Sequence, residues 1–242
     1  MTEAPQQLVL DLAHRVAMGR DDFLVSQANS AAVDVIDSWP EWPQRSLVIL
    51  GPAGSGKTHL VEVWRARAGG ARIEASRLGE AAVSSAVEAG ALAVEDVDRG
   101  IADERILFHL LNLARELKLS LLITSRDAPG DIAIALPDLR SRMRALGFVR
   151  IEAPDSALLS ALLVKLFDDR QLRVEPKIIE HLARRMERSA ENAARVVDAI
   201  DQLALERRRK VTIAVANDAL ARIAGQIAGG AASGDPVWRP EQ

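Results

Sequence analysis

The hydrophobic pattern of the chain changes in character near residue 154. Before that point, compact apolar runs alternate with segments of helical spacing. Three runs have the length and composition of buried parallel strands: "SLVIL" (46–50), "ALAVED" (91–96) and "LSLLITS" (119–125). A further strand is plausible at "ARIEA" (71–75). Helical spacing extends from Lys57 to about Ala68 and over residues 103–117. Strands that alternate with helices predict an α/β domain with a parallel sheet flanked by helices.

From Asp155 onward the sequence shows helical periodicity without a convincing strand. Pro154 and Pro176 stand before or at the start of two periodic segments, and Asp155 and Ser189 are residue types that favour helix N-caps. The periodic segments are about 155–169, 176–186, 190–207 and 214–228. The expected organisation is a tail over 1–20, an α/β domain over 21–153, a small all-helical domain over 154–228 and a flexible Gly/Pro-rich end over 229–242.

Bulk composition narrows the function classes. Of the 242 residues, 48% are hydrophobic and 27% are charged, which allows a sizeable core. The absence of Cys excludes disulfides and thiolate metal sites and fits a reducing cytoplasm. Neither a membrane span nor a signal peptide is indicated. A net charge of -3 and 3% aromatics argue against a protein that grips nucleic acid by itself, so DNA contact is expected to be indirect or weak.

The strongest chemical signal is "GPAGSGKT", which stands between an apolar run and a segment of helical spacing. It matches the phosphate-binding pattern G-x-x-x-x-G-K-[ST]; the alternative is an unrelated Gly-rich turn between a strand and a helix. In the phosphate-binding loop, backbone N–H groups converge on phosphate oxygens, the Lys reaches the β- and γ-phosphates, and the Thr hydroxyl binds Mg²⁺. The residues expected to bind ATP or ADP here are Gly51, Pro52, Ala53, Gly54, Ser55, Gly56, Lys57 and Thr58, with Thr58 also a magnesium ligand.

Such a loop requires an acid at the end of a neighbouring strand, and "LAVEDVD" (92–98) supplies it in an unusual form. The first acid, which is ordinarily an Asp that orders Mg²⁺, is Glu95 here, and Asp96 takes the place of the acid that activates water. Because Glu is one methylene longer, either the metal is held through a different water or hydrolysis is slow. We interpret Asp98 as a solvated loop acid.

The next apolar run ends in "LLITSR" (121–126), where Thr124 and Ser125 are short polar groups suited to sensing a terminal phosphate or positioning water. The alternative is that both are ordinary residues of a turn after a strand.

Taken together, these motifs resemble those of AAA+ ATPases, and more narrowly the DnaA/Hda clade. The resemblance rests on "GPAGSGKTHL", which adds His59 to the nucleotide site, on "LLITSRDAP", on "LPDLRSRM" (136–143), and on an upstream lead-in in which Phe23, Val25 and Asn29 match. It covers about residues 21–225 and implies a helical lid domain. The chain shows no DNA-reading helix-turn-helix segment after the lid, which favours an Hda-like plan.

The resemblance also implies roles for individual arginines. Arg142 takes the place of the arginine finger, a group that stabilises charge at the γ-phosphate of a neighbouring subunit, while the alternative is a basic solvated helix face. Arg140 and Arg144 flank it. The place of the sensor-2 Arg of the lid falls on Glu191, a departure from the family pattern. Either Arg195, one turn further on and on the same face, takes that role, or sensor 2 is missing.

The function implied is that of a regulator of replication initiation, in the cytoplasm at the replisome. Such a protein docks on the β sliding clamp and promotes hydrolysis of DnaA-bound ATP, while its own hydrolysis is slow. The N-terminal "QLVLDL" matches the clamp-binding form Q-L-x-L-x-L, so the expected clamp-binding residues are Gln7, Leu8, Leu10 and Leu12. Read without the resemblance, this stretch is a short edge strand.

Two other functions are open to a chain with these motifs. One is a DnaC-like or transposition-helper AAA+ ATPase that acts on single-stranded DNA or a helicase, which low aromatic content and negative net charge disfavour. The other is a P-loop kinase, which the helical second domain and "PDLRSRM" disfavour. Whether the chain forms a homo-oligomer or a mixed assembly with DnaA is left open.

Overall fold

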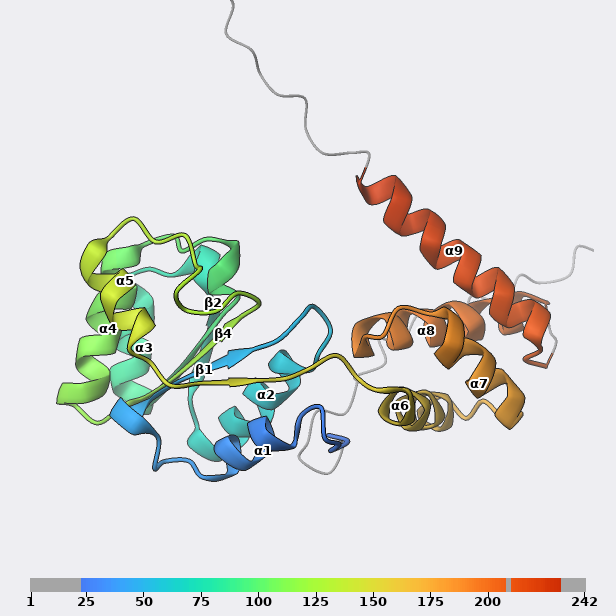
Figure 1. Cartoon of the computed structure of the whole chain (residues 1–242), viewed down its shortest axis with the longest axis horizontal. Helices are drawn as coiled ribbons and strands as arrows, with labels where there is room; N and C mark the ends of the chain where they lie inside the picture. The colour runs from blue at the N-terminus through green and yellow to red at the C-terminus, as the bar shows by residue number, and fades with distance from the viewer. Residues whose placement is uncertain (1–22, 208–209, 232–242) are drawn as a thin grey trace, which may run out of the picture.

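The computed structural model describes residues 23–207 and 210–231, and an α/β domain comes first in the chain (Figure 1). Within these residues five parallel strands form one sheet in the order β2-β3-β4-β1-β5. The strands are β1 (Ser46–Leu50), β2 (Ala71–Glu74), β3 (Ala91–Glu95), β4 (Ser120–Ser125) and β5 (Phe148–Arg150). The helices of this domain are α1 (Ser30–Asp37), α2 (Lys57–Ala68), α3 (Glu80–Ala89), α4 (Glu104–Glu116) and α5 (Pro137–Arg144).

The fold class predicted from the sequence is confirmed, because helices cover both faces of this parallel sheet (Figure 1). Along β1, Val48 and Leu50 pack in one cluster with residues of α3, α4 and α5, whereas Leu47 and Ile49 pack in the other with α1 and α2. Successive side chains of a strand point to opposite faces, so a strand that is apolar throughout requires cover on both sides. Every residue of β1, β3 and β4 is buried.

The four expected strands are present within one residue of their predicted limits, but β5 was not predicted. It is an edge strand of three residues beside β1, with Phe148 and Arg150 exposed. A pattern of this kind lacks the apolar run that identifies a buried strand. The helices α1, α3 and α5 were likewise not delimited by the pattern.

A second, helical domain follows β5 (Figure 1). Its elements are α6 (Ser156–Asp169), α7 (Pro176–Arg185), α8 (Ala190–Arg207) and α9 (Ile213–Ala231), and their apolar faces meet in a core of their own. Both predicted N-caps form: the Leu158 N–H donates to Asp155 Oδ1 (2.7 Å), and the Asn192 N–H donates to Ser189 Oγ (3.0 Å). Among the described residues, no helix is long and apolar enough to cross a membrane.

The helical domain touches the α/β domain at Gly54, in the loop between β1 and α2. The Ala190 N–H, at the start of α8, donates to the Gly54 carbonyl (2.8 Å). A Cβ on Gly54 would lie 2.8 Å from Ser189 Cβ and 2.9 Å from Glu191 Cβ, too close for any side chain. Since these neighbours are Cβ atoms and not flexible side-chain ends, the first turn of α8 itself would have to move. The absence of a side chain at Gly54 therefore lets the helical domain close on the loop.

We expect Gly54→Ala to open the helical domain, and Gly69→Ala is the matched control. Both glycines have left-handed φ angles, +65° and +67°, so alanine at either position costs about 1 kcal/mol in backbone strain. A Cβ on Gly69 meets nothing within 4 Å. Fluorescence energy transfer between dyes on α4 and α9 is expected to fall in Gly54→Ala only. The same transfer efficiency in both variants would contradict the contact.

Candidate nucleotide-binding site

The loop between β1 and α2 is shaped to receive phosphate. The Gly51 N–H donates to the Ser125 carbonyl (3.1 Å), which ties the start of the loop to the end of β4. Among the described residues, the N–H groups of Gly54, Gly56 and Lys57 have no protein acceptor. Gly56 has a φ of +100°, a conformation that favours glycine. Free N–H groups at the N-terminus of α2 are suited to an anion, because the helix dipole adds to their charge.

Lys57 is buried at the centre of this loop. Its Nζ donates to the carbonyls of Gly51 (2.6 Å) and Pro52 (3.0 Å), which leaves one of its three N–H donors for a ligand. Burial lowers the pKa of Lys57, Asp96 raises it, and Arg126 lowers it further. An anion bound beside Lys57 would oppose the effect of burial and favour the charged ammonium.

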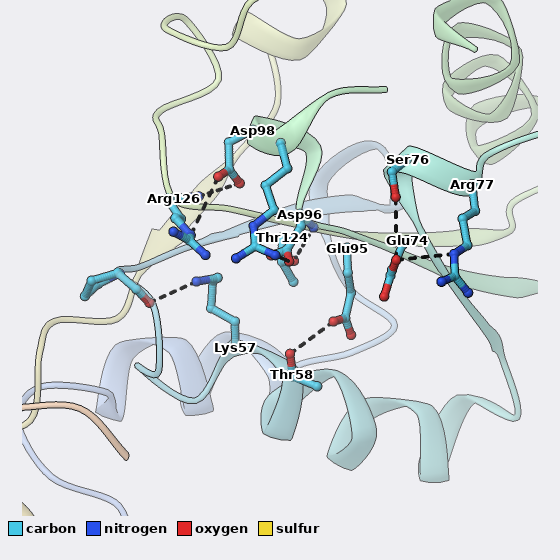
Figure 2. A network of polar contacts seen from close by, with 12 residues as sticks. Lys57, Thr58, Glu74, Ser76, Arg77, Glu95, Asp96, Asp98, Thr124 and Arg126 are labelled. Carbon is cyan, nitrogen blue, oxygen red and sulfur yellow. Dashed lines mark hydrogen bonds and ion pairs between the residues drawn. The ribbon is translucent and has the colours of Figure 1, made fainter. Parts of the chain in front are cut away.

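Thr58 and Glu95 lie together at the start of α2 and the end of β3 (Figure 2). The Thr58 hydroxyl donates to Glu95 Oε2 (3.0 Å), and the Glu95 side chain is nearly inaccessible. Its Oε1 is buried and has no hydrogen-bond donor among the described residues, although Arg72 Nη1 lies 3.7 Å from it. Burial raises the pKa of Glu95, against the effects of the Thr58 hydrogen bond and of Arg72.

These two residues fit a magnesium ion, because Mg²⁺ prefers hard oxygen ligands and Oε1 lacks a hydrogen bond. The described residues hold no cluster of three or more His, Cys, Asp or Glu that could form a complete cage. This also fits Mg²⁺, which is ordinarily held by one or two protein groups together with substrate phosphates and water.

Asp96 follows Glu95 with its backbone in the left-handed region, at a φ of 57°. The Asp96 N–H donates to Thr124 Oγ1 (3.0 Å), so the Thr124 side chain at the end of β4 fixes this conformation. The Asp96 carboxylate is partly exposed and lies 3.6 Å from Arg99 Nη1. The structure thus brings both predicted acids and Thr124 to one edge of the sheet.

Ser125 is used within its own turn. Its hydroxyl donates to the Asp127 carbonyl (2.7 Å) and accepts from the Asp127 N–H (3.1 Å). The buried Ser125 side chain shapes the turn after β4, which is the alternative that the sequence left open.

The interpretation of Asp98 as a solvated loop acid is wrong. Its side chain is only 6% exposed, and its Oδ1 accepts from the Arg126 N–H (2.9 Å). Asp98 Oδ2 lies 3.8 Å from Arg126 Nε. Asp98 therefore joins the turn after β3 to the end of β4. The sequence gave no sign of this, because the partner is a backbone N–H group 28 residues away.

A small apolar pocket adjoins the phosphate loop and encloses a cavity of about 80 Å³. The pocket lies between the two domains, and its lining includes Phe23, Asn29, His59, Ile151, Pro154, Leu158 and Ala190. The rings of Phe23 and His59 meet edge to face, with centroids 5.0 Å apart. The Asn29 side chain accepts from the Ser26 N–H and donates to the Leu24 carbonyl, and these bonds hold the segment that precedes α1. Val25, in the same segment, is exposed. A purine base is of the chemical kind that such a pocket accepts.

The remaining predicted residues lie apart from this site. Arg142 is on α5, whose buried residues pack on the sheet face opposite to α2, and its guanidinium carbon lies 5.6 Å from the centre of the Phe108 ring. Arg140 donates to the carbonyl of Ile134 and so is occupied within the chain. Arg195, on α8, is half-buried and has no ion pair among the described residues. Gln7, Leu8, Leu10 and Leu12 lie outside the described residues.

Comparison with solved structures identifies the fold. Domain III of the replication initiation protein DnaA from Thermotoga maritima matches with a TM-score of 0.71 and 18% identity, over 85% of this chain and 96% of that one. AMPPCP-bound DnaA from Aquifex aeolicus matches with a TM-score of 0.63 and 19% identity, over 76% and 64%. RuvB from Thermotoga maritima, a Holliday junction branch migration motor, matches with a TM-score of 0.62 and 16% identity, over 85% of this chain and 72% of that one. The chain therefore has the AAA+ fold that these proteins share.

No protein-family model and no curated protein sequence matches the chain. The likeness is thus carried by the arrangement of elements, and at these identities it does not assign an activity.

We expect Glu95→Gln to remove a pH-dependent loss of folding stability in the ligand-free protein. Because the pKa of Glu95 is raised in the folded state, its ionised form disfavours folding, and this cost grows as the pH rises from the ordinary carboxyl pKa through the raised one. Gln is uncharged at every pH and can still accept from Thr58. The stability of the variant relative to wild type is therefore expected to increase as the pH rises above the ordinary carboxyl pKa of about 4, as measured by urea unfolding. A relative stability that falls over this range would contradict the burial effect.

Proposed function

We propose that the chain is an AAA+ regulator of replication initiation that binds ATP or ADP with Mg²⁺ and supplies Arg142 to the ATP site of DnaA. The observation that carries the proposal is the separation of Arg142 from the chain's own phosphate loop. Arg142 stands on α5, on the face of the sheet opposite to α2. An arginine in this place is suited to a nucleotide on a neighbouring molecule.

The surroundings of Arg142 support this role. Its half-buried guanidinium lies over the Phe108 ring, a contact that leaves the guanidinium N–H donors free of any ion pair among the described residues. Arg140, two residues earlier, is by contrast bound to backbone carbonyls of its own chain. The fold shared with domain III of DnaA favours a mixed assembly, because like folds can stack with the arginine of one subunit at the nucleotide of the next.

The chain's own nucleotide serves mainly as a conformational ligand. Glu95 replaces the shorter Asp beside Thr58, and the lid brings Glu191, not an Arg, against Gly54 of the phosphate loop. Glu95, one methylene longer than Asp, shifts the carboxylate beside the metal, and Glu191 places negative charge where an Arg would stabilise the triphosphate during hydrolysis. Mg²⁺, when bound at Thr58 and Glu95, would neutralise phosphate charge. The first turn of α8 packs on the same loop, so a nucleotide bound in the loop would affect the position of the helical domain.

In the partner's site, Arg142 acts on charge and forms no covalent bond. A water attacks the γ-phosphorus, the bond to the bridging oxygen breaks, and ADP, phosphate and a proton are released. The guanidinium stabilises the charge that spreads over the phosphoryl oxygens as this bond breaks.

Localisation to replicating DNA is proposed to come from the N-terminal stretch that contains Gln7, Leu8, Leu10 and Leu12. An extended peptide of this pattern places the Gln amide and alternate leucines in pockets of the β sliding clamp. With a net charge of -3, the chain is expected to reach DNA through the clamp, in the cytoplasm at the replisome.

We expect Gln7→Ala/Leu8→Ala to reduce binding to the β clamp by at least about tenfold, because both side chains are anchors of an extended peptide. Gln6→Ala is the matched control, since Gln6 falls outside the Q-L-x-L-x-L spacing. Surface plasmon resonance with immobilised clamp measures the affinities. A wild-type chain that ignores the clamp and binds single-stranded DNA at physiological salt would favour the alternative DNA-acting ATPase.

We expect Arg142→Ala to abolish stimulated hydrolysis of DnaA-bound ATP while clamp binding is unchanged. An arginine finger contributes about 10³ to 10⁵ in rate, so the loss is expected to reach the unstimulated level. The matched control is Arg144→Ala, an exposed arginine on the same helix. DnaA loaded with labelled ATP and mixed with the chain and with clamp on DNA provides the assay. Full stimulation by Arg142→Ala would contradict the role.

A further inference from the structure

We infer that Glu104 is the positioning residue of Arg142, because its carboxylate fixes the start of α5, the helix that carries this arginine, against α4. The inference rests on the proposed function, in which Arg142 acts on the nucleotide of a partner. It concerns a residue that lies outside the motifs of the sequence and belongs to a different helix from Arg142.

Both oxygens of the Glu104 carboxylate are bound at the start of α5. Oε1 accepts from the Ala135 N–H (2.8 Å), and Oε2 accepts from the Leu136 N–H (2.6 Å). Leu136 is the N-cap of α5, and its own side chain has no oxygen to offer. A Glu at the third position of a helix is well suited to accept from the N-cap N–H. That position is Leu139 here, so Glu104 supplies the carboxylate from α4 instead.

The start of α5 has few other fixed points. The helix is eight residues long and follows residues 126–136, which form neither helix nor strand. So short a helix is not stable by itself and takes its position from its contacts. Leu139 and Met143 bury one side of it in the core, and Arg140 Nε donates to the Ile134 carbonyl (3.0 Å). Apolar packing is not directional, and the Arg140 bond stays within the segment, whereas the two bonds from Glu104 join the segment to α4.

The same side of α4 contacts Arg142 one turn later. Phe108 is four residues after Glu104, so both side chains lie on one face of the helix. The Arg142 guanidinium carbon lies 5.6 Å from the centre of the Phe108 ring. A contact between a cation and an aromatic ring is weak where water has access, and by itself it does not hold a long side chain. Glu104 fixes the backbone of α5, and the ring then directs the guanidinium.

The position of Arg142 follows from that of the N-cap. Arg142 is six residues after Leu136, or about 9 Å along the helix axis, so a displacement at the start of α5 is carried to the guanidinium. Stabilisation of a transition state depends on the position of the stabilising group, and a misplacement of about 1 Å can lower a rate by about 100-fold. Loss of Glu104 is therefore expected to lower the rate at which bound DnaA is stimulated, and not the affinity for DnaA.

Stimulated hydrolysis of DnaA-bound ATP, titrated with the full chain in the presence of clamp on DNA, separates these two quantities. We expect Glu104→Ala to lower the maximal rate by about 10- to 100-fold and to leave the half-saturating concentration of the chain within about twofold. Glu104→Gln keeps one acceptor oxygen, so its maximal rate is expected to be intermediate. Asp155→Ala is the matched control with the wild-type rate, because it loses a bond of the same kind, from a carboxylate to a backbone N–H, in the helical domain.

A nuclear magnetic resonance signal reports the position of Arg142 in the chain without DnaA. Protons over the face of an aromatic ring are shifted upfield, so the Arg142 Nε–H signal is expected upfield of its usual position in the wild type and close to that position in Phe108→Leu. Its disappearance in Arg142→Lys assigns it. We expect Glu104→Ala to move the signal as Phe108→Leu does, and Asp155→Ala to leave it unchanged. A Glu104 that only stabilised the fold would leave the signal in place.

Loss of both the maximal rate and the shifted signal in Glu104→Ala supports the inference. A wild-type rate or a wild-type signal in the folded variant would overturn it, while stimulation by the wild type leaves the proposed function intact. A raised half-saturating concentration with an unchanged maximal rate would also overturn it, because Glu104 would then belong to the contact surface. A wild-type chain that does not stimulate DnaA would refute the proposed function, and the inference with it. If Glu104→Ala does not fold, as judged by urea unfolding, Glu104→Gln is measured in its place, with changes in the same direction expected.

Discussion

Parallel pairing of β1, β4 and β3 is the constraint on which the site depends, because it brings the carboxyl ends of three strands to one edge of the sheet. The phosphate loop follows β1, Glu95 ends β3, and Thr124 and Arg126 stand at the end of β4. Every residue of the three strands is buried, so helices must cover both faces, and the polar residues of these strands stand at their ends. Burial of the strand interiors stabilises the sheet, and it also leaves the carboxyl ends of the strands as the place where the polar residues of the site can gather.

Burial disfavours the charged forms of both Lys57 and Glu95 at this edge of the sheet. It lowers the pKa of Lys57 and raises the pKa of Glu95, so both groups are driven toward neutrality in the free protein. A phosphate would favour the charged lysine, and a cation would favour the charged glutamate. A magnesium nucleotide supplies both at once, which makes ligand binding and the charge state of the site interdependent. The helical domain contacts the same loop at Gly54, where the first turn of α8 packs on it, so its position depends on the conformation of the loop.

The sequence predicted the parts of the molecule whose signals are local. Apolar runs located β1 to β4, helical spacing located α2, α4 and the lid helices, and the "GPAGSGKT" pattern located the phosphate loop. The edge strand β5 escaped, because three residues with an exposed Phe148 carry no burial pattern. The burial of Asp98 was not predicted, because the sequence does not distinguish a buried carboxylate from a solvated one when its partner is a distant backbone N–H group. Arg126 was present in the sequence as a basic residue after a strand, and only the sheet order showed that it faces Lys57.

Arg142 lies on α5, on the face of the sheet opposite to α2, with its guanidinium over the Phe108 ring. We propose that it serves the nucleotide of a partner and not the chain's own. The most direct measurement is the rate of ATP hydrolysis by the wild-type chain and by DnaA, each preloaded with labelled ATP and followed separately, alone and mixed in the presence of clamp on DNA. The account predicts slow hydrolysis of the chain's own nucleotide in every mixture and accelerated hydrolysis of the nucleotide on DnaA. Rapid hydrolysis of the chain's own ATP, with no change in the rate on DnaA, would contradict it.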